Sequence, residues 1–173
     1  MKVREKLDCM SKPIYLDYNA TTSHAPEVVA AMRPFLEEHF GNPSSAHVYG
    51  RVMREAVDKA RIQVADLLGV SPDEIVFTSG GTEANNYAIK GTALARKDRG
   101  NHIITSAIEH PAVLEVCAWL EKQGFEITRL SVDATGLVDP EQLRKVITSR
   151  TVLVSIMHAN NEVGTVQPIR ALA

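Results

Sequence analysis

The chain has 173 residues, of which 45% are hydrophobic and 23% are charged, and this is the size and composition of an ordinary globular protein with one buried core. Its formal net charge of −2 and the lack of any stripe of lysines and arginines exclude a nucleic-acid-binding surface, and no apolar stretch reaches the roughly 18 residues that a membrane span needs. The charged first residues lack the apolar segment of a signal peptide, and the two cysteines, Cys9 and Cys117, argue against a disulfide framework, so we expect a cytoplasmic protein.

The first part of the chain predicts a short strand followed by two helices. The sequence "PIYLDYNATT", residues 13–22, begins as a strand and ends in turn-forming residues. Residues 23–40 form the first predicted helix, with Pro26 in its first turn and Pro34 expected to bend or shorten it. After a turn at residues 41–43, the second predicted helix ends at Gly69 and carries one apolar stripe, made of Met53, Val57, Ala60, Val64 and Leu68.

The rest of the chain alternates between strand and helix patterns. Strands are predicted at residues 74–79, 102–107, 125–132 and 151–158. Helices are predicted at residues 83–97, 111–123 and 139–147, the second stopped by Gly124 and the third opened by Asp139 as its N-cap. Apolar strands that alternate with helices predict an α/β fold, with a mostly parallel sheet covered by helices on both faces.

Polar loops follow three of these strands. In parallel sheets, ligands bind beyond the carboxyl ends of the strands, where the loops at residues 79–86, 107–111 and 159–164 are expected to lie. These loops and their flanks contain the candidate site residues, which are Thr78, Ser79, Gly80, Gly81, Thr82, Glu109, His110, Asn160, Asn161 and Glu162.

The first loop has the composition of an anion site. The glycines Gly80 and Gly81 allow backbone N–H groups to approach an anion, and the helix dipole and the Thr82 hydroxyl favour the same ligand. A plain tight turn with Thr82 as a helix cap is an equally good interpretation of the spacing. The loop is neither a P-loop nor a G-x-G-x-x-G fingerprint, since both motifs need residues that are missing here.

The remaining candidates each have a simple structural interpretation as well. The positive end of a helix disfavours a protonated ring at His110, so we expect a neutral imidazole suited to stacking or proton transfer, although a capping or surface histidine is the commoner case. Asn160 and Asn161 could orient a ligand by hydrogen bonds or simply form a turn. Cys117 and Trp119 are expected to be packing residues and Lys90 a solvated side chain. The histidine spacing predicts no metal site.

Five segments of the sequence, taken in order, closely resemble the cysteine desulfurases, which are pyridoxal-phosphate enzymes of the class V aminotransferase family. The segments are "YLDYNATT", "GNPSSAH", "FTSGGTEANN", "HIITSAIEH" and "VSIMHANNEVGTVQPI". The resemblance runs from about Pro13 to Ala173, nearly the whole chain. It implies that residues 13–173 are the N-terminal portion of the large cofactor domain of a fold-type I enzyme, with residues 1–12 as an extension.

The resemblance implies pyridoxal 5'-phosphate as the cofactor and gives roles to four residues. Gly81 and Thr82 match the loop that holds the cofactor phosphate, and His110 matches a histidine that stacks on the pyridine ring and takes part in proton transfer. Asn161 matches an asparagine that binds the phenolic oxygen side of the cofactor and helps to place the substrate carboxylate. The implied reaction removes sulfur from L-cysteine, gives L-alanine and forms an enzyme persulfide that serves iron–sulfur clusters, thio-cofactors or tRNA.

The resemblance also identifies residues that this chain does not contain. The lysine that anchors the cofactor, the acid that faces the pyridine nitrogen and the persulfide cysteine all lie further along in the family, and none of the eight lysines here follows a predicted strand. We therefore expect a truncated fragment that is inactive alone, with an incomplete sheet, an exposed sheet edge and exposed apolar helix faces.

Other functions fit the same motifs. A selenocysteine lyase or another class V aminotransferase shares the phosphate loop. A non-catalytic binding or dimerisation module is the alternative outside the enzymes. For the full-length form, the resemblance implies a homodimer that passes sulfur to an acceptor or scaffold protein.

Overall fold

The computed structural model describes residues 13–173 and divides the chain into two compact units. One unit comprises the described residues up to Val76, and the other runs from Phe77 to Ala173. Each unit is described by itself below. The predicted domain over residues 13–173 spans both units and stays a prediction, and the predicted extension over residues 1–12 lies outside the described residues.

The first unit consists of helices that begin and end at local sequence signals. Helix α1 covers Pro26–Glu37 with a proline at its start, and helix α2 covers Val48–Leu68. A short 3₁₀ helix, η1, covers Pro72–Glu74. Gly69 ends α2 in the left-handed conformation, with φ of 67°, which glycine adopts without the steric cost that a side chain would add. Both predicted helices of this region are confirmed.

Two predicted strands are wrong. Residues 13–17 and 75–78 adopt no regular secondary structure, although both segments are rich in apolar residues. A strand requires a neighbour that accepts and donates its backbone hydrogen bonds, and no described strand pairs with either segment. The side chains show the same result, since Ile14 is 85% exposed and Val76 is 52% exposed.

The apolar stripe of α1 is only partly covered by the described residues of its unit. Val28, Met32, Phe35 and Leu36 are 43–76% exposed, so the stripe that predicts this helix lies on an exposed surface. The exposed apolar helix face expected from the sequence is therefore present on α1.

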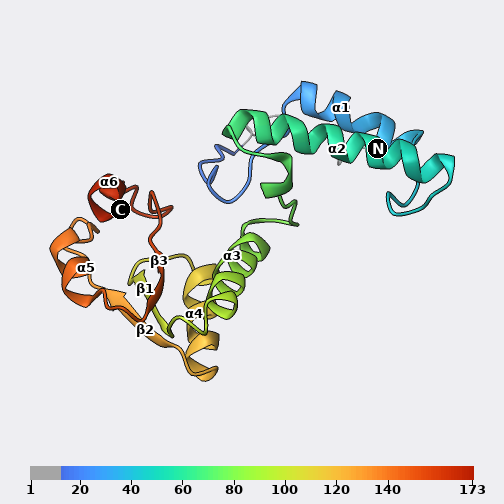
Figure 1. The fold of residues 1–173 in the computed structure, drawn as a ribbon. Helices are drawn as coiled ribbons and strands as arrows, with labels where there is room; N and C mark the ends of the chain where they lie inside the picture. The colour runs from blue at the N-terminus through green and yellow to red at the C-terminus, as the bar shows by residue number, and fades with distance from the viewer. Residues whose placement is uncertain (1–12) are drawn as a thin grey trace. The chain divides into compact units, whose positions relative to one another are not determined.

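The second unit is a three-layered α/β structure built on a parallel sheet (Figure 1). Its strands are β1 (His102–Ser106), β2 (Glu126–Leu130) and β3 (Thr151–Ser155), in the order β2-β1-β3. Both neighbours of β1 run parallel to it, so the predicted α/β class and parallel sheet are confirmed. The helices are α3 (Gly81–Ala95), α4 (Pro111–Lys122), α5 (Pro140–Val146) and α6 (Ile169–Leu172).

Alternating residues of β1 face two separate cores. Ile103 packs with α3 and α4 on one face of the sheet, in a cluster that includes Ile89 and Leu120. Ile104 packs on the other face with Leu143 of α5, and Leu172 of α6 borders that cluster. Successive side chains of a strand point to opposite faces, and helices cover both faces, which is why β1 is buried along its whole length.

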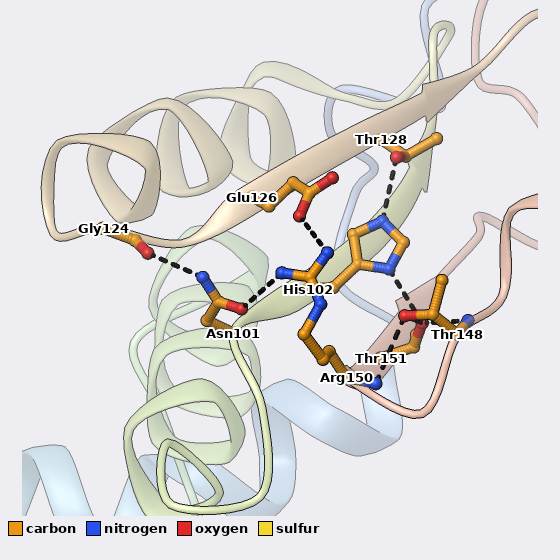
Figure 2. Close-up of polar contacts among 8 residues, drawn as sticks. All are labelled: Asn101, His102, Gly124, Glu126, Thr128, Thr148, Arg150 and Thr151. Carbon is orange, nitrogen blue, oxygen red and sulfur yellow. Dashed lines mark hydrogen bonds and ion pairs between the residues drawn. The ribbon is translucent and has the colours of Figure 1, made fainter.

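A closed polar network fills the amino end of the sheet (Figure 2). The buried imidazole of His102 hydrogen-bonds the Thr151 hydroxyl on one side at 2.8 Å and the Thr128 hydroxyl on the other at 2.9 Å. One histidine thus joins all three strands.

The loops before the strands extend this network outward (Figure 2). Arg150 donates to the Asn101 amide oxygen at 3.1 Å and to the Glu126 carboxylate at 2.8 Å, and the Asn101 amide donates to the Gly124 carbonyl at 3.1 Å. The backbone of Gly100 lies so close to the backbone of Arg150 that a Cβ atom on Gly100 would be 2.2 Å from the Arg150 carbonyl oxygen. Only glycine permits this approach.

Candidate functional site

The loops at the carboxyl end of the sheet are joined by the buried carboxylate of Glu109. Its Oε1 accepts a hydrogen bond from the Ser106 hydroxyl at 2.8 Å and another from the Met157 N–H at 2.7 Å. Ser106 is the last residue of β1, and Met157 lies two residues beyond β3. The predicted meeting of the second and third polar loops is therefore confirmed.

Asn160 organises the turn that follows β3. Its side-chain oxygen accepts hydrogen bonds from the N–H groups of Glu162 and Val163, both at 2.9 Å, and its amide donates to the Ile108 carbonyl at 3.0 Å. Asn160 is buried and serves the turn, whereas the exposed side chain of Asn161 donates to Glu162 at 3.0 Å. Of the two asparagines, only Asn161 presents its side chain at the surface.

Backbone donors are exposed at the start of α3. Within the described residues, the N–H groups of Gly81 and Thr82 and the Thr82 hydroxyl have no hydrogen-bond partner. The first N–H groups of a helix lack partners inside the helix, and the dipole adds partial positive charge there. A Cβ atom on Gly81 would meet nothing within 4 Å, so the backbone at this point faces open space. This geometry suits an anion.

Glu83 limits the donors that the loop can offer. Its carboxylate accepts from both the N–H and the hydroxyl of Ser79 at 2.6 Å, and these hydrogen bonds hold the pKa of Glu83 below its ordinary value. Ser79 is therefore engaged by the protein itself, and the donors of Gly81 and Thr82 stay available to a ligand.

His110 is the N-cap of α4. Its Nδ1 accepts a hydrogen bond from the Ala112 N–H at 3.0 Å, so Nδ1 carries no proton in this arrangement. A neutral ring then has its proton on Nε2, which leaves an N–H donor on the far side of an exposed imidazole. The structural interpretation as a cap and the proposed chemical use of the ring are compatible, because they involve different nitrogens.

One cavity brings Thr82 and His110 together. It has a volume of about 400 Å³ and lies between α3 and α4. Asn161 does not contribute to its lining, so the structure places the phosphate-loop threonine beside the histidine but does not bring the asparagine to the same cavity. Gly81 precedes Thr82 at the first position of α3.

Sequence reasoning missed four other residues that line this cavity, which are Asn86, Lys90, Glu115 and Trp119. The prediction that Lys90 is only a solvated side chain is wrong, because its ammonium lies 4.5 Å from the centre of the Trp119 ring in a cation–π contact. The available signal was helical spacing. Thr82, Asn86 and Lys90 recur every four residues on α3, which places them on one side of the helix.

Other candidate chemistry is not supported within residues 13–173. No group of three or more His, Cys, Asp or Glu side chains there could hold a metal ion, and no helix there is long and apolar enough to cross a bilayer. Cys117 is fully buried, and burial raises the pKa of its thiol above the ordinary value. A protonated, inaccessible thiol is a packing group rather than a nucleophile.

Comparisons with known proteins identify relatives of this chain. Residues 14–173 match the family model described as Aminotransferase class-V. The chain is 57% identical over 164 residues to a cysteine desulfurase IscS of Dictyoglomus turgidum, covering 95% of this chain and 42% of the relative. It spans less than half the length of that relative.

Solved structures give the same picture. A structure named "NIFS-LIKE PROTEIN" superimposes with a TM-score of 0.86 at 45% identity, covering 92% of this chain and 45% of the other. A structure named "SspA in complex with cysteine" superimposes with a TM-score of 0.84 at 46% identity, covering 91% of this chain and 46% of the other.

Proposed function

The chain belongs to the class V aminotransferase family, and from this membership we propose that it is the N-terminal part of a pyridoxal-phosphate enzyme that removes sulfur from L-cysteine. The family model covers residues 14–173, which is nearly all of the described chain. Curated relatives named as cysteine desulfurases, at 50–57% identity, support the choice of reaction within the family.

The observation that carries the cofactor assignment is the group of unpaired donors at the start of α3. The N–H groups of Gly81 and Thr82 and the Thr82 hydroxyl fit the phosphate of pyridoxal phosphate, since three donors at a helix N-terminus suit a phosphate group. His110 lines the same cavity as Thr82, and its exposed ring is suited to lie against an aromatic cofactor. When bound, the cofactor supplies a ring that withdraws electrons from bonds of an amino acid substrate.

The protein's own groups account for binding and for one proton position. Gly81 and Thr82 bind the phosphate, and the Nε2–H of His110 can donate to an acceptor above the cavity while the Ala112 N–H fixes the ring from the other side. Asn161, which stays a prediction as a ligand, lies in the turn held by Asn160. These residues orient a ligand and can exchange a proton with it.

Lys90 is the lysine to test for covalent attachment. Among the lysines in residues 13–173, it is the one that lines the cavity with Thr82 and His110, but its ammonium lies against Trp119. We therefore propose that the 173-residue chain by itself binds pyridoxal phosphate without a covalent bond to lysine, and that it does not turn over L-cysteine.

We extend the proposal to the whole protein, again by likeness to its relatives. It would act in the cytoplasm as a homodimer and would deliver sulfur to an acceptor or scaffold protein for iron–sulfur cluster or thio-cofactor assembly. A structure named "SspA in complex with cysteine" supports L-cysteine as the substrate. A selenocysteine lyase, or a binding and dimerisation module without catalysis, is the alternative that the test must separate.

The test is an absorbance titration of the purified chain with pyridoxal phosphate, followed by borohydride reduction and peptide mass mapping. We expect saturable binding that inorganic phosphate competes away, no lysine specifically labelled, and no L-alanine formed when L-cysteine is added. Failure of a demonstrably folded chain to bind overturns the cofactor assignment. Labelling of Lys90 overturns the non-covalent proposal, and Lys90→Arg is then the control that must abolish the label.

A further inference from the structure

Glu109 is a buried carboxylate without a cationic partner. Only 6% of the residue is exposed, and no basic side chain of the described residues forms an ion pair with it. Burial of a charge is costly unless hydrogen bonds compensate it. The compensation here comes from two donors, the Ser106 hydroxyl and the Met157 N–H, and both bind the same oxygen, Oε1.

These two bonds join segments that are distant in the sequence. Met157 is 48 residues from Glu109, and it belongs to the segment that leads from β3 into the Asn160 turn. A second bond joins the same two segments, from the Asn160 amide to the Ile108 carbonyl, across 52 residues. The segment after β1 is therefore tied to the segment after β3 at Ile108 and at Glu109.

The tied residues directly flank the predicted cofactor ligands. His110 follows Glu109, and Asn161 follows Asn160. His110 has one backbone-fixed nitrogen as the cap of α4, and its ring direction depends on where the chain enters that helix. Displacement of the 106–109 segment would therefore move the ring of His110, and displacement of the 157–160 segment would move Asn161.

We infer that Glu109 is a positioning residue for the cofactor site, whose carboxylate oxygen fixes His110 and the Asn161 turn relative to each other. It acts as a hydrogen-bond acceptor and touches neither cofactor nor substrate. The inference rests on the proposed function for its purpose, although the connection between the two segments stands on the geometry alone. A residue that only stabilised the sheet would not need to join these two loops.

Two substitutions of Glu109 test whether its role depends on a hydrogen-bond acceptor or on a negative charge. Glu109→Gln keeps an Oε1 acceptor for Ser106 and Met157 in a side chain of the same shape, whereas Glu109→Leu removes it. Thr105→Val is the matched control, because the buried Thr105 hydroxyl donates to the Ser155 carbonyl at 2.9 Å and so ties β1 to β3 without touching either loop.

The experiment uses the 173-residue chain and measures the order of the two loops without ligand and the affinity of the chain for pyridoxal phosphate. Amide hydrogen exchange of Met157 and the ring ¹⁵N spectrum of His110 report the cofactor-free protein, and titration with pyridoxal phosphate reports affinity. For Glu109→Leu we expect the Met157 amide to exchange faster by about tenfold or more, and the His110 ring to lose its single Nε2–H tautomer. The affinity for pyridoxal phosphate should be weaker by about tenfold, which is equivalent to about 1.4 kcal/mol. Glu109→Gln should match the wild type in all three, and Thr105→Val should lower the unfolding temperature only.

Each result tests either the positioning role of Glu109 or the proposed function. Wild-type exchange and an unchanged His110 spectrum in Glu109→Leu overturn the inference, as does a Glu109→Gln variant that behaves like Glu109→Leu, because then the charge and not the acceptor matters. If the wild type does not bind pyridoxal phosphate while the exchange and ring measurements go as expected, the proposed function fails and the positioning role stands.

Discussion

The two ends of the central sheet use polar side chains in opposite ways. At the amino end, His102, Thr128 and Thr151 satisfy one another across all three strands. At the carboxyl end, Glu109 and Asn160 are equally engaged, but the Thr82 hydroxyl and the N–H groups beside it have no partner among the described residues.

This difference separates structural polar groups from binding groups. A buried polar network that is complete within the protein holds strands together and has no capacity left for a ligand. Donors that stay unpaired at a helix N-terminus are a cost to the free protein and an advantage once an anion arrives. A buried histidine such as His102 is therefore a poor candidate for chemistry, and an exposed capping histidine such as His110 is a good one.

The largest expected effect is at the amino end. A Cβ atom in Gly100→Ala would overlap the Arg150 carbonyl oxygen, and both positions are backbone, so neither can rotate away. We expect a loss of about 3 kcal/mol in the free energy of unfolding, the upper part of the range for overpacking. Chemical denaturation measures it. A variant as stable as the wild type would show that the amino end is not held as tightly as its network indicates.

A smaller effect, confined to ligand binding, is expected at the carboxyl end. Thr82→Val removes a hydroxyl that has no partner in the free protein, so the unfolding free energy should change by less than about 0.5 kcal/mol. Its hydrogen bond to a charged phosphate should contribute about 1.5 kcal/mol, so affinity for pyridoxal phosphate should fall roughly tenfold. Thr82→Ser is the control that keeps the hydroxyl. Equal losses of stability and affinity would contradict the separation of roles.

The smallest effect is a pH dependence of the phosphate loop. Hydrogen bonds from Ser79 lower the pKa of the Glu83 carboxylate, so its contribution to loop stability is present above the ordinary value of 4.5 and is lost as pH falls through the lowered pKa. The protection factor of the Ser79 amide, which corrects for the intrinsic pH dependence of exchange, should therefore fall in acid, whereas Glu83→Gln should show no such fall. Because Glu83 is fully exposed, global stability should scarcely change.

Sequence patterns predict the elements whose signals are local. Gly69 caps the end of helix α2, and Asp139 caps the start of helix α5, where its carboxylate accepts from the Glu141 N–H at 2.9 Å. Both boundaries depend on residues within one turn. The strands of the second unit are also predicted correctly, since each has a neighbour within the same unit. The segments at residues 13–17 and 75–78 have the composition of strands but lack such a neighbour, and composition cannot supply one.

The candidate site likewise contains some features that local sequence signals predict and others that depend on contacts between distant residues. The start of α3 and the cap at His110 follow from glycine, helix and proline signals a few residues long. The contact of Lys90 with Trp119 joins two helices, and the bond from Met157 to Glu109 spans 48 residues. No spacing rule within one element indicates such pairs, because they depend on how the helices and loops pack.

The strand order has a consequence for the synthesis of this chain on the ribosome. β1 lies in the middle of the sheet, yet it is the first of the three strands to be made, and its partner Thr151 on β3 follows His102 by 49 residues. At about 5–20 residues per second, one side of the strand "HIITS" stays unpaired for roughly 2–10 seconds after it is made. The nascent chain therefore keeps one edge of its central strand unpaired until β3 is made, although the finished protein buries this strand along its whole length.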